Sequence, residues 1–258
     1  MDSDSTPQAD TPTPTEYEDR LLIYLDVLGW SKLIKGSIDK REDRETLAAI
    51  AERLRTPVAA MELSLEKGED FFGIRVSQFS DTLVLSCPLG DRRLVFALCV
   101  MAIATAQVVV ARGYYLRGAV VEGKLIHRPD VIYGPALVAA YEVERDVAEY
   151  PRIVVTPGAE ETLRRAKRKF SWSLLCRDRD GLMYLNVLTP SHVGPEDRRR
   201  FRADIEQRQV RDANDLGLLS KHHWMLSYLD EIEREAQEGR SNSEKTPAPS
   251  RTAPKRHP

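Results

Sequence analysis

Two aspartates lie at sites where a carboxylate is costly unless a cation balances it. Asp26 is the single charge near the end of Arg20–Leu28 (RLLIYLDVL), an apolar run typical of a buried central strand. Asp81 lies at the bend between two short predicted strands. Because two hard oxygen ligands at one sheet edge suit Mg²⁺ or Mn²⁺ bridging phosphate oxygens, the pair predicts a two-metal phosphoryl-transfer site.

A purely structural alternative exists for each aspartate. Asp26 can cap the helix that follows, and Asp81 can serve as a turn residue. The segment 27–31 is a predicted strand-to-helix junction whose backbone amides are suited to phosphate oxygens, with Gly29 allowing close approach. One glycine is a weak signal for such a site.

The elements that must position these residues form one patterned unit. The predicted order is β-α-β-β-α-β followed by further strands and helices, which is an α+β, ferredoxin-like core with extra C-terminal elements. In this sheet the first strand and the hairpin are central neighbours, so Asp26 and Asp81 are expected to converge. The predicted strands are 20–28, 71–79, 82–86, 114–121, 126–132, 153–156, 173–177 and 182–188, and the predicted helices are 41–67, 91–112, 135–148, 159–169, 195–211 and 215–234.

Composition predicts a soluble globular chain without a general affinity for polyanions. The chain has 258 residues, 42% of them hydrophobic, and a formal net charge of −2, which favours neither nucleic acid nor a membrane surface as a partner. Cys87, Cys99 and Cys176 show no CxxC spacing, which argues against disulfides or zinc. The apolar run Leu94–Ala111 is interpreted as a core helix, and no signal peptide pattern precedes it. We therefore expect a cytoplasmic protein.

Four regions are predicted along the chain. Residues 1–17 form a disordered N-terminal tail, because Ser, Thr, Pro and Asp dominate there. Residues 18–190 form the catalytic domain and residues 191–237 a helical extension. Residues 238–258 form a second disordered tail.

Four motifs together resemble class III nucleotidyl cyclases. Leu25–Ser31 (LDVLGWS) resembles the first metal motif of that family, and Phe79–Asp81 (FSD) its second, with Ser where Gly is usual. Leu116–Gly123 (LRGAVVEG) resembles the family's L-R-x-G-I-H-x-G strand, whose phosphate-contacting arginine falls on Arg117. Gly134–Glu142 (GPALVAAYE) stands where the family carries G-x-x-V-N-x-A-A-R.

The last motif departs from the purine cyclases. The family's transition-state Asn and Arg fall on Val138 and Glu142, and its base-reading Lys and Asp fall on Arg75 and Val131. The purine cyclase mechanism is therefore not carried over whole.

A narrower resemblance is to the pyrimidine cyclases of bacterial antiphage (Pycsar) systems. Phe79–Asp81, Arg117–Ala119, Gly134–Glu144 and Ala148–Ile153 carry it, within a span of roughly residues 20–190. It implies a cytoplasmic homodimer with active sites at the interface, which makes cyclic UMP or cyclic CMP from UTP or CTP with Mn²⁺ or Mg²⁺. UTP is favoured slightly. The product would activate a separate effector in response to phage.

The resemblance also implies residue roles. Asp26 and Asp81 hold two metal ions, with the Val27 carbonyl as an extra ligand, and Arg117 contacts the phosphates; its alternative is a surface ion pair. Arg75 is assigned to a pyrimidine carbonyl, with a solvated strand-edge arginine as the alternative.

Other candidate residues are weaker. Tyr141 is assigned to stacking on the base, although a core aromatic on an amphipathic helix fits the pattern better. His222 and His223 point to different helix faces, so packing or solvation is favoured over a metal pair. His127 has no assigned role.

Two other functions compete with a pyrimidine cyclase. A catalytically inactive cyclase-like domain that binds a nucleotide or partner is supported by Val138 and Glu142, whereas retention of Asp26 and Asp81 argues against it. A diguanylate cyclase requires a GG[DE]EF hairpin, and Gln78–Thr82 (QFSDT) does not provide one.

Overall fold

The computed structural model describes residues 16–55, 73–166, 174–188 and 193–244. Its strands are β1 (Glu18–Val27), β2 (Arg75–Phe79), β3 (Thr82–Pro88), β4 (Leu116–His127), β5 (Ile132–Tyr133), β6 (Ile153–Val155), β7 (Leu175–Arg177) and β8 (Met183–Leu185). Its helices are α1 (Trp30–Ser37), α2 (Arg41–Leu54), α4 (Arg92–Val110), α5 (Pro135–Asp146), α6 (Pro157–Ala166), α7 (Pro195–Arg211) and α8 (Leu216–Glu244).

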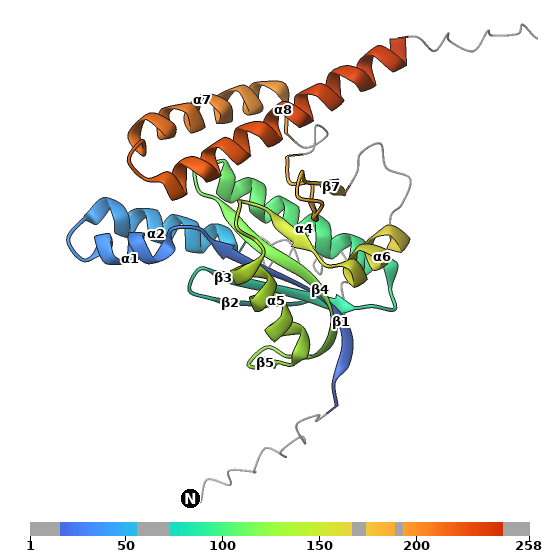
Figure 1. Cartoon of the computed structure of the whole chain (residues 1–258). Helices are drawn as coiled ribbons and strands as arrows, with labels where there is room; N and C mark the ends of the chain where they lie inside the picture. Colours follow the sequence, from blue (N-terminus) through green and yellow to red (C-terminus); the bar gives the residue numbers. More distant parts are fainter. Residues whose placement is uncertain (1–15, 56–72, 167–173, 189–192, 245–258) are drawn as a thin grey trace, which may run out of the picture.

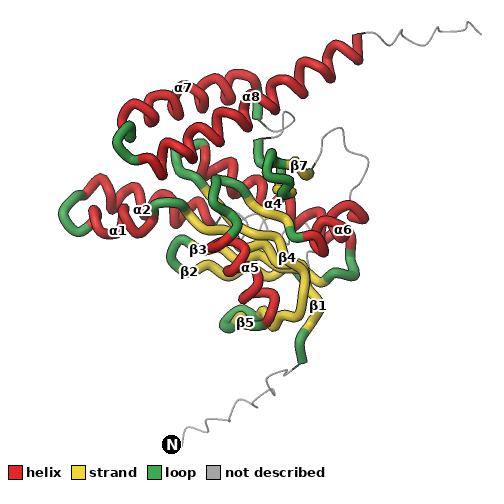
Figure 2. Tube along the Cα trace, in the orientation of Figure 1, coloured by secondary structure: helices red, strands yellow, loops and turns green. Residues whose placement is uncertain are grey.

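One mixed sheet forms the centre of the fold, with helices around it (Figures 1 and 2). The strand order is β2-β3-β1-β4-β6-β8-β7, and β5 pairs with β4 off this path. Strands β2, β3, β1 and β4 are mutually antiparallel, and β6 joins β4 in parallel. The predicted α+β class and βαββαβ order are confirmed, including the central position of the first strand beside the hairpin.

Alternation along β1 assigns each of its side chains to one face of the sheet. Leu21, Ile23 and Leu25 are fully buried in the larger core with α4, whereas Leu22 and Tyr24 pack in a second core with α5. Because strand side chains alternate with a period of two, Asp26 follows Tyr24 onto the α5 face. The covering helix α5 is therefore the element that faces this carboxylate.

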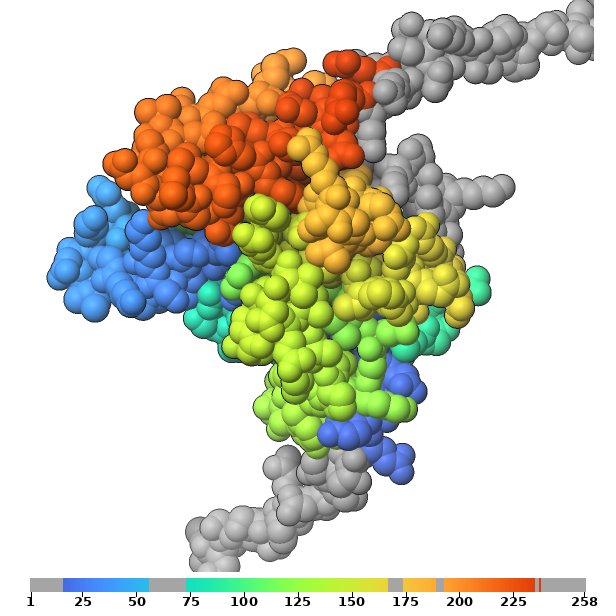
Figure 3. All heavy atoms as spheres, viewed as in Figure 1, coloured from blue at the N-terminus to red at the C-terminus, as the bar shows by residue number. Residues whose placement is uncertain are grey.

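The C-terminal helices α7 and α8 pack over one end of the sheet (Figures 1 and 3). A third core joins them to α4, to the start of β4 and to β8. Its buried members are Val110, Tyr115, Tyr184, Leu188, Ile205, Met225, Tyr228, Leu229 and Ile232. Tyr228 donates to Asn186 and accepts from the Leu188 amide, so α8 is also fixed by hydrogen bonds.

Several boundaries differ from the sequence prediction. The separate strand predicted at 126–132 is wrong in its bounds. Strand β4 continues unbroken to His127, and the short strand β5 begins only at Ile132. Gly123 lies inside this continuous strand, and a Cβ on it would lie 3.3 Å from that of Ala136, so the glycine permits close helix packing.

The helical segments differ from the prediction as well. Helix α1 follows the predicted strand-to-helix junction at 27–31, although no bounds were predicted for it. Helix α2 ends at Leu54, with residues 56–67 of its predicted span outside the described residues. Helix α8 continues to Glu244, into the range that composition assigned to a tail.

The apolar segment interpreted as a core helix is α4. It is long and apolar enough to cross a membrane by length and composition, but 56% of its most apolar window is buried inside the fold.

Cys87 and Cys99 are buried free thiols. His127 bonds Ser77 and Ser86 within the sheet.

Candidate active site

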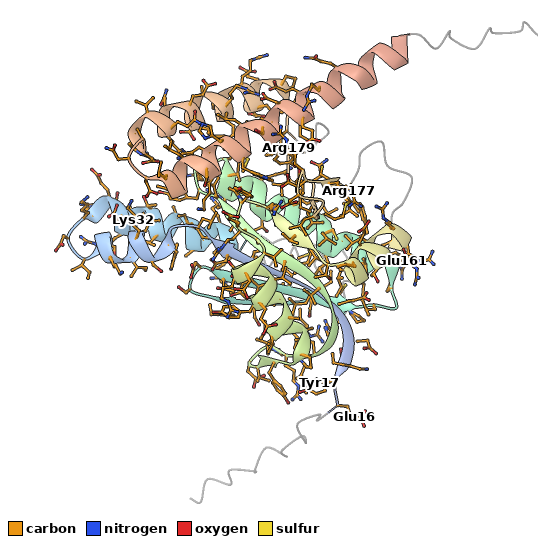
Figure 4. All side chains as sticks on the ribbon, viewed as in Figure 1. Glu16, Tyr17, Lys32, Glu161, Arg177 and Arg179 are labelled. Carbon is orange, nitrogen blue, oxygen red and sulfur yellow. The ribbon has the colours of Figure 1, made fainter. Side chains whose placement is uncertain are left out.

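The site begins with a cross-strand pair. Asp26 of β1 lies directly opposite Arg117 of β4 in the antiparallel ladder. The Arg117 Nε is 3.9 Å from the Asp26 Oδ2, and the two side chains are 26% and 20% exposed. Asp26 is the last residue but one of β1, whereas Tyr17, labelled in Figure 4, directly precedes the first residue of that strand. The sequence-predicted carboxylate and arginine therefore meet at one edge of the sheet.

The β2–β3 turn brings Asp81 to the same edge. Phe79 and Thr82 close the ladder, leaving Ser80 and Asp81 as the turn. Ser80 has φ 53°, a left-handed conformation unfavourable for a residue with a Cβ. The Trp30 Nε1 donates to the Ser80 Oγ at 2.9 Å, which ties this turn to the first residue of α1.

The pKa of Asp26 depends on burial and on the charged groups around it. The pKa of Asp26 is raised to about 7, by burial first and then by the negative charges of Asp81 and Glu144, whereas Arg117 acts in the opposite direction. A hydrogen bond between the carboxyl groups of Asp26 and Asp81 also raises this pKa. The Thr82 Oγ1 lies 3.4 Å from the Asp26 Oδ1. The site thus has an excess of negative charge for a cation to balance.

Sequence reasoning gave no role to Glu144. This residue of α5 is 3% exposed, and its Oε1 forms an ion pair with the Arg117 Nε. The signal available in the sequence was a four-residue repeat along the inner face of α5, formed by Ala136, Ala140 and Glu144 and continued by Ala148 just beyond the helix, all of which are buried. A single acid in an otherwise apolar helix stripe indicates a buried charge partner.

The donor set fits divalent cations held jointly with a substrate. Within the described residues, no cluster of three or more His, Cys, Asp or Glu side chains is suited to a metal ion. Mg²⁺-like ions, however, are commonly held by one or two carboxylates together with substrate phosphates and water. Asp26 and Asp81 provide such a pair, and a cation would relieve the mutual repulsion that raises the Asp26 pKa.

The predicted phosphate-binding junction is only partly available. Gly29 has φ 87° and open space where a side chain would lie. The Leu28 amide, in contrast, already donates to the Tyr115 carbonyl at 2.9 Å, so it is not free for a phosphate. The Val27 side chain is buried, and its backbone ends β1 directly beside Asp26.

Of the two predicted base-contacting residues, Arg75 does not join the carboxylates in one chain. Arg75 pairs with Ser86 at the end of the β2–β3 ladder opposite the Asp81 turn. Tyr141 is 46% exposed on α5, with its ring edge toward Tyr24 and the Arg145 guanidinium over its face, so it is not the core aromatic that the pattern favoured.

Two cavities in the part of the chain that the structure describes lie away from these carboxylates. One of about 700 Å³ lies between α4 and α7 and is lined by Gln107 and Phe201, among others. One of about 460 Å³ lies between the β7–β8 hairpin and α8. Neither is lined by Asp26, Asp81 or Arg117, so the carboxylate site does not coincide with either cavity.

Comparisons with known proteins give structural likenesses only. No family model and no curated protein matches this chain. The adenylyl cyclase CyaB from P. aeruginosa is similar over 67% of this chain and 95% of its own, with 14% identity and a TM-score of 0.45. A guanylyl cyclase domain of a RhoGC fusion protein from Blastocladiella emersonii is similar over 66% of this chain and 96% of its own, with 11% identity and a TM-score of 0.44. An adenylate/guanylate cyclase/hydrolase from Silicibacter pomeroyi is similar over 66% of this chain and 95% of its own, with 12% identity and a TM-score of 0.37.

Proposed function

We propose that this protein is a nucleotidyl cyclase that converts a pyrimidine nucleoside triphosphate into its 3′,5′-cyclic monophosphate and pyrophosphate. UTP is the first candidate substrate and CTP the second. The observation that carries the proposal is the convergence of Asp26 and Asp81 at one sheet edge with Arg117 opposite Asp26. The motif resemblance around these residues supports the choice of reaction.

In this reaction the substrate 3′-hydroxyl loses its proton to solvent and its oxygen bonds to the α-phosphorus, while the bond from that phosphorus to the β-phosphate oxygen breaks and pyrophosphate leaves. Two divalent cations, Mn²⁺ or Mg²⁺, would supply charge neutralisation at the attacking and leaving oxygens when bound. Asp26 and Asp81 would hold these cations at the sheet edge, with the Val27 carbonyl as a further oxygen ligand. Arg117 donates to phosphate oxygens from its planar guanidinium, which suits their geometry. The chain thus contributes position and electrostatics.

A second copy of the chain is part of the proposal. Large apolar side chains are exposed on α5 and at the β2–β3 turn, namely Val138, Tyr141 and Phe79. A homodimer that covers them would bring Arg75 of one copy toward the carboxylates of the other. In the cytoplasm the cyclic product would then activate a separate effector in phage defence.

The test is an assay of the purified chain with each of the four NTPs and Mn²⁺, read by chromatography of the cyclic product. We expect the unmodified chain to produce cyclic UMP. The activity of Asp26→Ala and of Asp81→Ala should be below detection, and that of Arg117→Ala should be reduced about 100-fold. Asp39→Ala, which removes an exposed carboxylate, is the matched control. Full activity in either site-aspartate variant would overturn the metal assignment. In cells, Asp81→Ala should abolish phage protection.

A catalytically inactive, nucleotide-binding domain is the second candidate. The exposed faces of α5 carry Val138 and Glu142 where the resembled family places its transition-state Asn and Arg. Binding of an NTP without turnover, under conditions in which Mn²⁺ is saturating, would favour this candidate.

A further inference from the structure

The buried carboxylate of Glu144 requires a specific partner. It lies on the inner stripe of α5, one turn after Ala140, where the helix packs against the sheet, and the buried Ala148 follows just beyond the helix. Burying an ionised carboxylate costs several kcal/mol unless its charge is paired. An apolar residue in the same place would complete the stripe without this cost. The presence of an acid at this buried position is therefore explained by the cationic side chain that it contacts.

That partner is Arg117, whose Nε is the atom closest to the Glu144 carboxylate. Within the described residues, the ion pairs of Arg117 with Glu144 and with Asp26 both involve its Nε. This Nε is itself buried, and neither it nor the Glu144 Oε1 makes an aligned hydrogen bond. A guanidinium held at Nε keeps its two terminal amino groups for another acceptor, because the five donors point outward from one plane.

We propose that Glu144 is a positioning residue that holds the Arg117 guanidinium so that its terminal amino groups face the substrate triphosphate beside Asp26. The inference rests on the proposed function and deepens it. A free arginine loses rotamer entropy when it binds phosphate, and an arginine already fixed by a buried carboxylate loses less. Glu144 thus acts through Arg117 without touching the substrate.

Charge alone predicts the opposite effect of removing Glu144. Glu144→Gln removes a negative charge close to the site, which by Coulomb's law should tighten the binding of a polyanion. Loss of positioning should instead weaken it. The sign of the change therefore separates the two explanations.

The experiment is a double-mutant cycle of Glu144→Gln and Arg117→Gln in the full chain, read by calorimetric binding of Mn²⁺-tripolyphosphate. We expect Glu144→Gln to weaken binding about 10-fold and to lower kcat in the NTP assay. It should have no further effect in the Arg117→Gln background. The control Glu149→Gln makes the same chemical change at an exposed site just beyond α5 and should bind as the unmodified chain does.

Unchanged or tighter binding by Glu144→Gln overturns the inference, as does equal weakening in both Arg117 backgrounds. If Glu144→Gln fails to fold by circular dichroism, Glu144→Asp replaces it. The shorter acid keeps the charge but withdraws from Nε, so weaker binding is again expected, and unchanged binding contradicts the inference.

The two proposals fail separately. If the unmodified chain cyclises none of the four NTPs, the proposed function fails, yet the tripolyphosphate cycle still decides the role of Glu144. If the unmodified chain does not bind tripolyphosphate, Arg117 is not a phosphate ligand and the positioning role is overturned.

Discussion

At the scale of single residues, the site holds unfavourable charge that a ligand would relieve. Asp26 is partly buried beside Asp81, and Glu144 adds negative charge that Arg117 only partly offsets. Such an arrangement costs stability in the absence of a cation. Functional sites commonly retain features of this kind at the expense of stability.

Metal binding is therefore expected to stabilise the protein through Asp26. Mn²⁺ should raise the Tm of the unmodified chain, and EDTA should reverse the shift. At pH 8, Asp26→Asn removes the repulsion, so its metal-free Tm should equal or exceed that of the unmodified chain while the Mn²⁺ shift disappears. Differential scanning fluorimetry measures both. A full Mn²⁺ shift in Asp26→Asn would show that the metal binds elsewhere, and Asp39→Asn is the control.

His127 is expected to give the stability a separate dependence on pH. The pKa of His127 is lowered to about 4, by burial first and then by the nearby charges of Arg20 and Arg75. Its ring nitrogens bond Ser77 and Ser86. Because the unfolded chain binds the proton near pH 6.5 and the folded chain does not, this stability is present above pH 6.5 and is lost as the pH falls toward 4.

The size of this effect is about 2 kcal/mol between pH 7.5 and pH 5. Urea unfolding at the two pH values should show that His127→Gln reduces the pH dependence by this amount. An unchanged dependence in His127→Gln would mean that other groups cause it.

At the scale of elements, the short helix α1 and the β2–β3 turn stabilise each other. Trp30, 8% exposed, begins α1 directly after the left-handed Gly29 and donates to Ser80. The turn thus has a fixed position relative to the end of β1, and with it Asp81 has a fixed position relative to Asp26.

Substitutions at Ser80 separate backbone strain from the hydrogen bond. Ser80→Ala and Ser80→Gly both lose the hydroxyl, but only glycine adopts φ 53° without strain. Ser80→Gly should therefore be more stable than Ser80→Ala by roughly 0.5–1 kcal/mol in urea unfolding. Trp30→Phe should cost about 1 kcal/mol alone and nothing further in the Ser80→Gly background. Additive effects would show that Trp30 acts only by packing.

At the scale of the whole molecule, one chain does not gather all the residues assigned to the site. Asp26, Asp81 and Arg117 share one sheet edge, whereas Arg75 lies at the far end of the β2–β3 ladder. The helices α7 and α8 cover another part of the sheet (Figure 3). A second copy is the simplest source of the missing half of the site.

Complementation tests this arrangement. Asp26→Ala and Arg75→Ala should each be inactive alone. An equal mixture, after subunit exchange, should recover about a quarter of the unmodified activity, because half of the dimers then hold one intact site. No recovery, although light scattering shows mixed dimers, would place Arg75 outside the substrate site.

The sequence by itself determined the features that depend on local pattern. The apolar run around Asp26, the bend at Asp81 and the βαββαβ order follow from strand alternation and turn residues, which act over a few positions. The central neighbours β1 and β3 then follow from topology. Asp26 and Asp81 could therefore be placed together before any coordinates.

Only the tertiary structure decided which charges pair. Glu144 and Arg117 are 27 positions apart along the chain, and their contact depends on how α5 lies across β4. The tie between Trp30 and Ser80 and the separation of Arg75 from the carboxylates also follow from strand register and helix docking. These depend on the packing of whole faces, a long-range property that residue spacing does not encode.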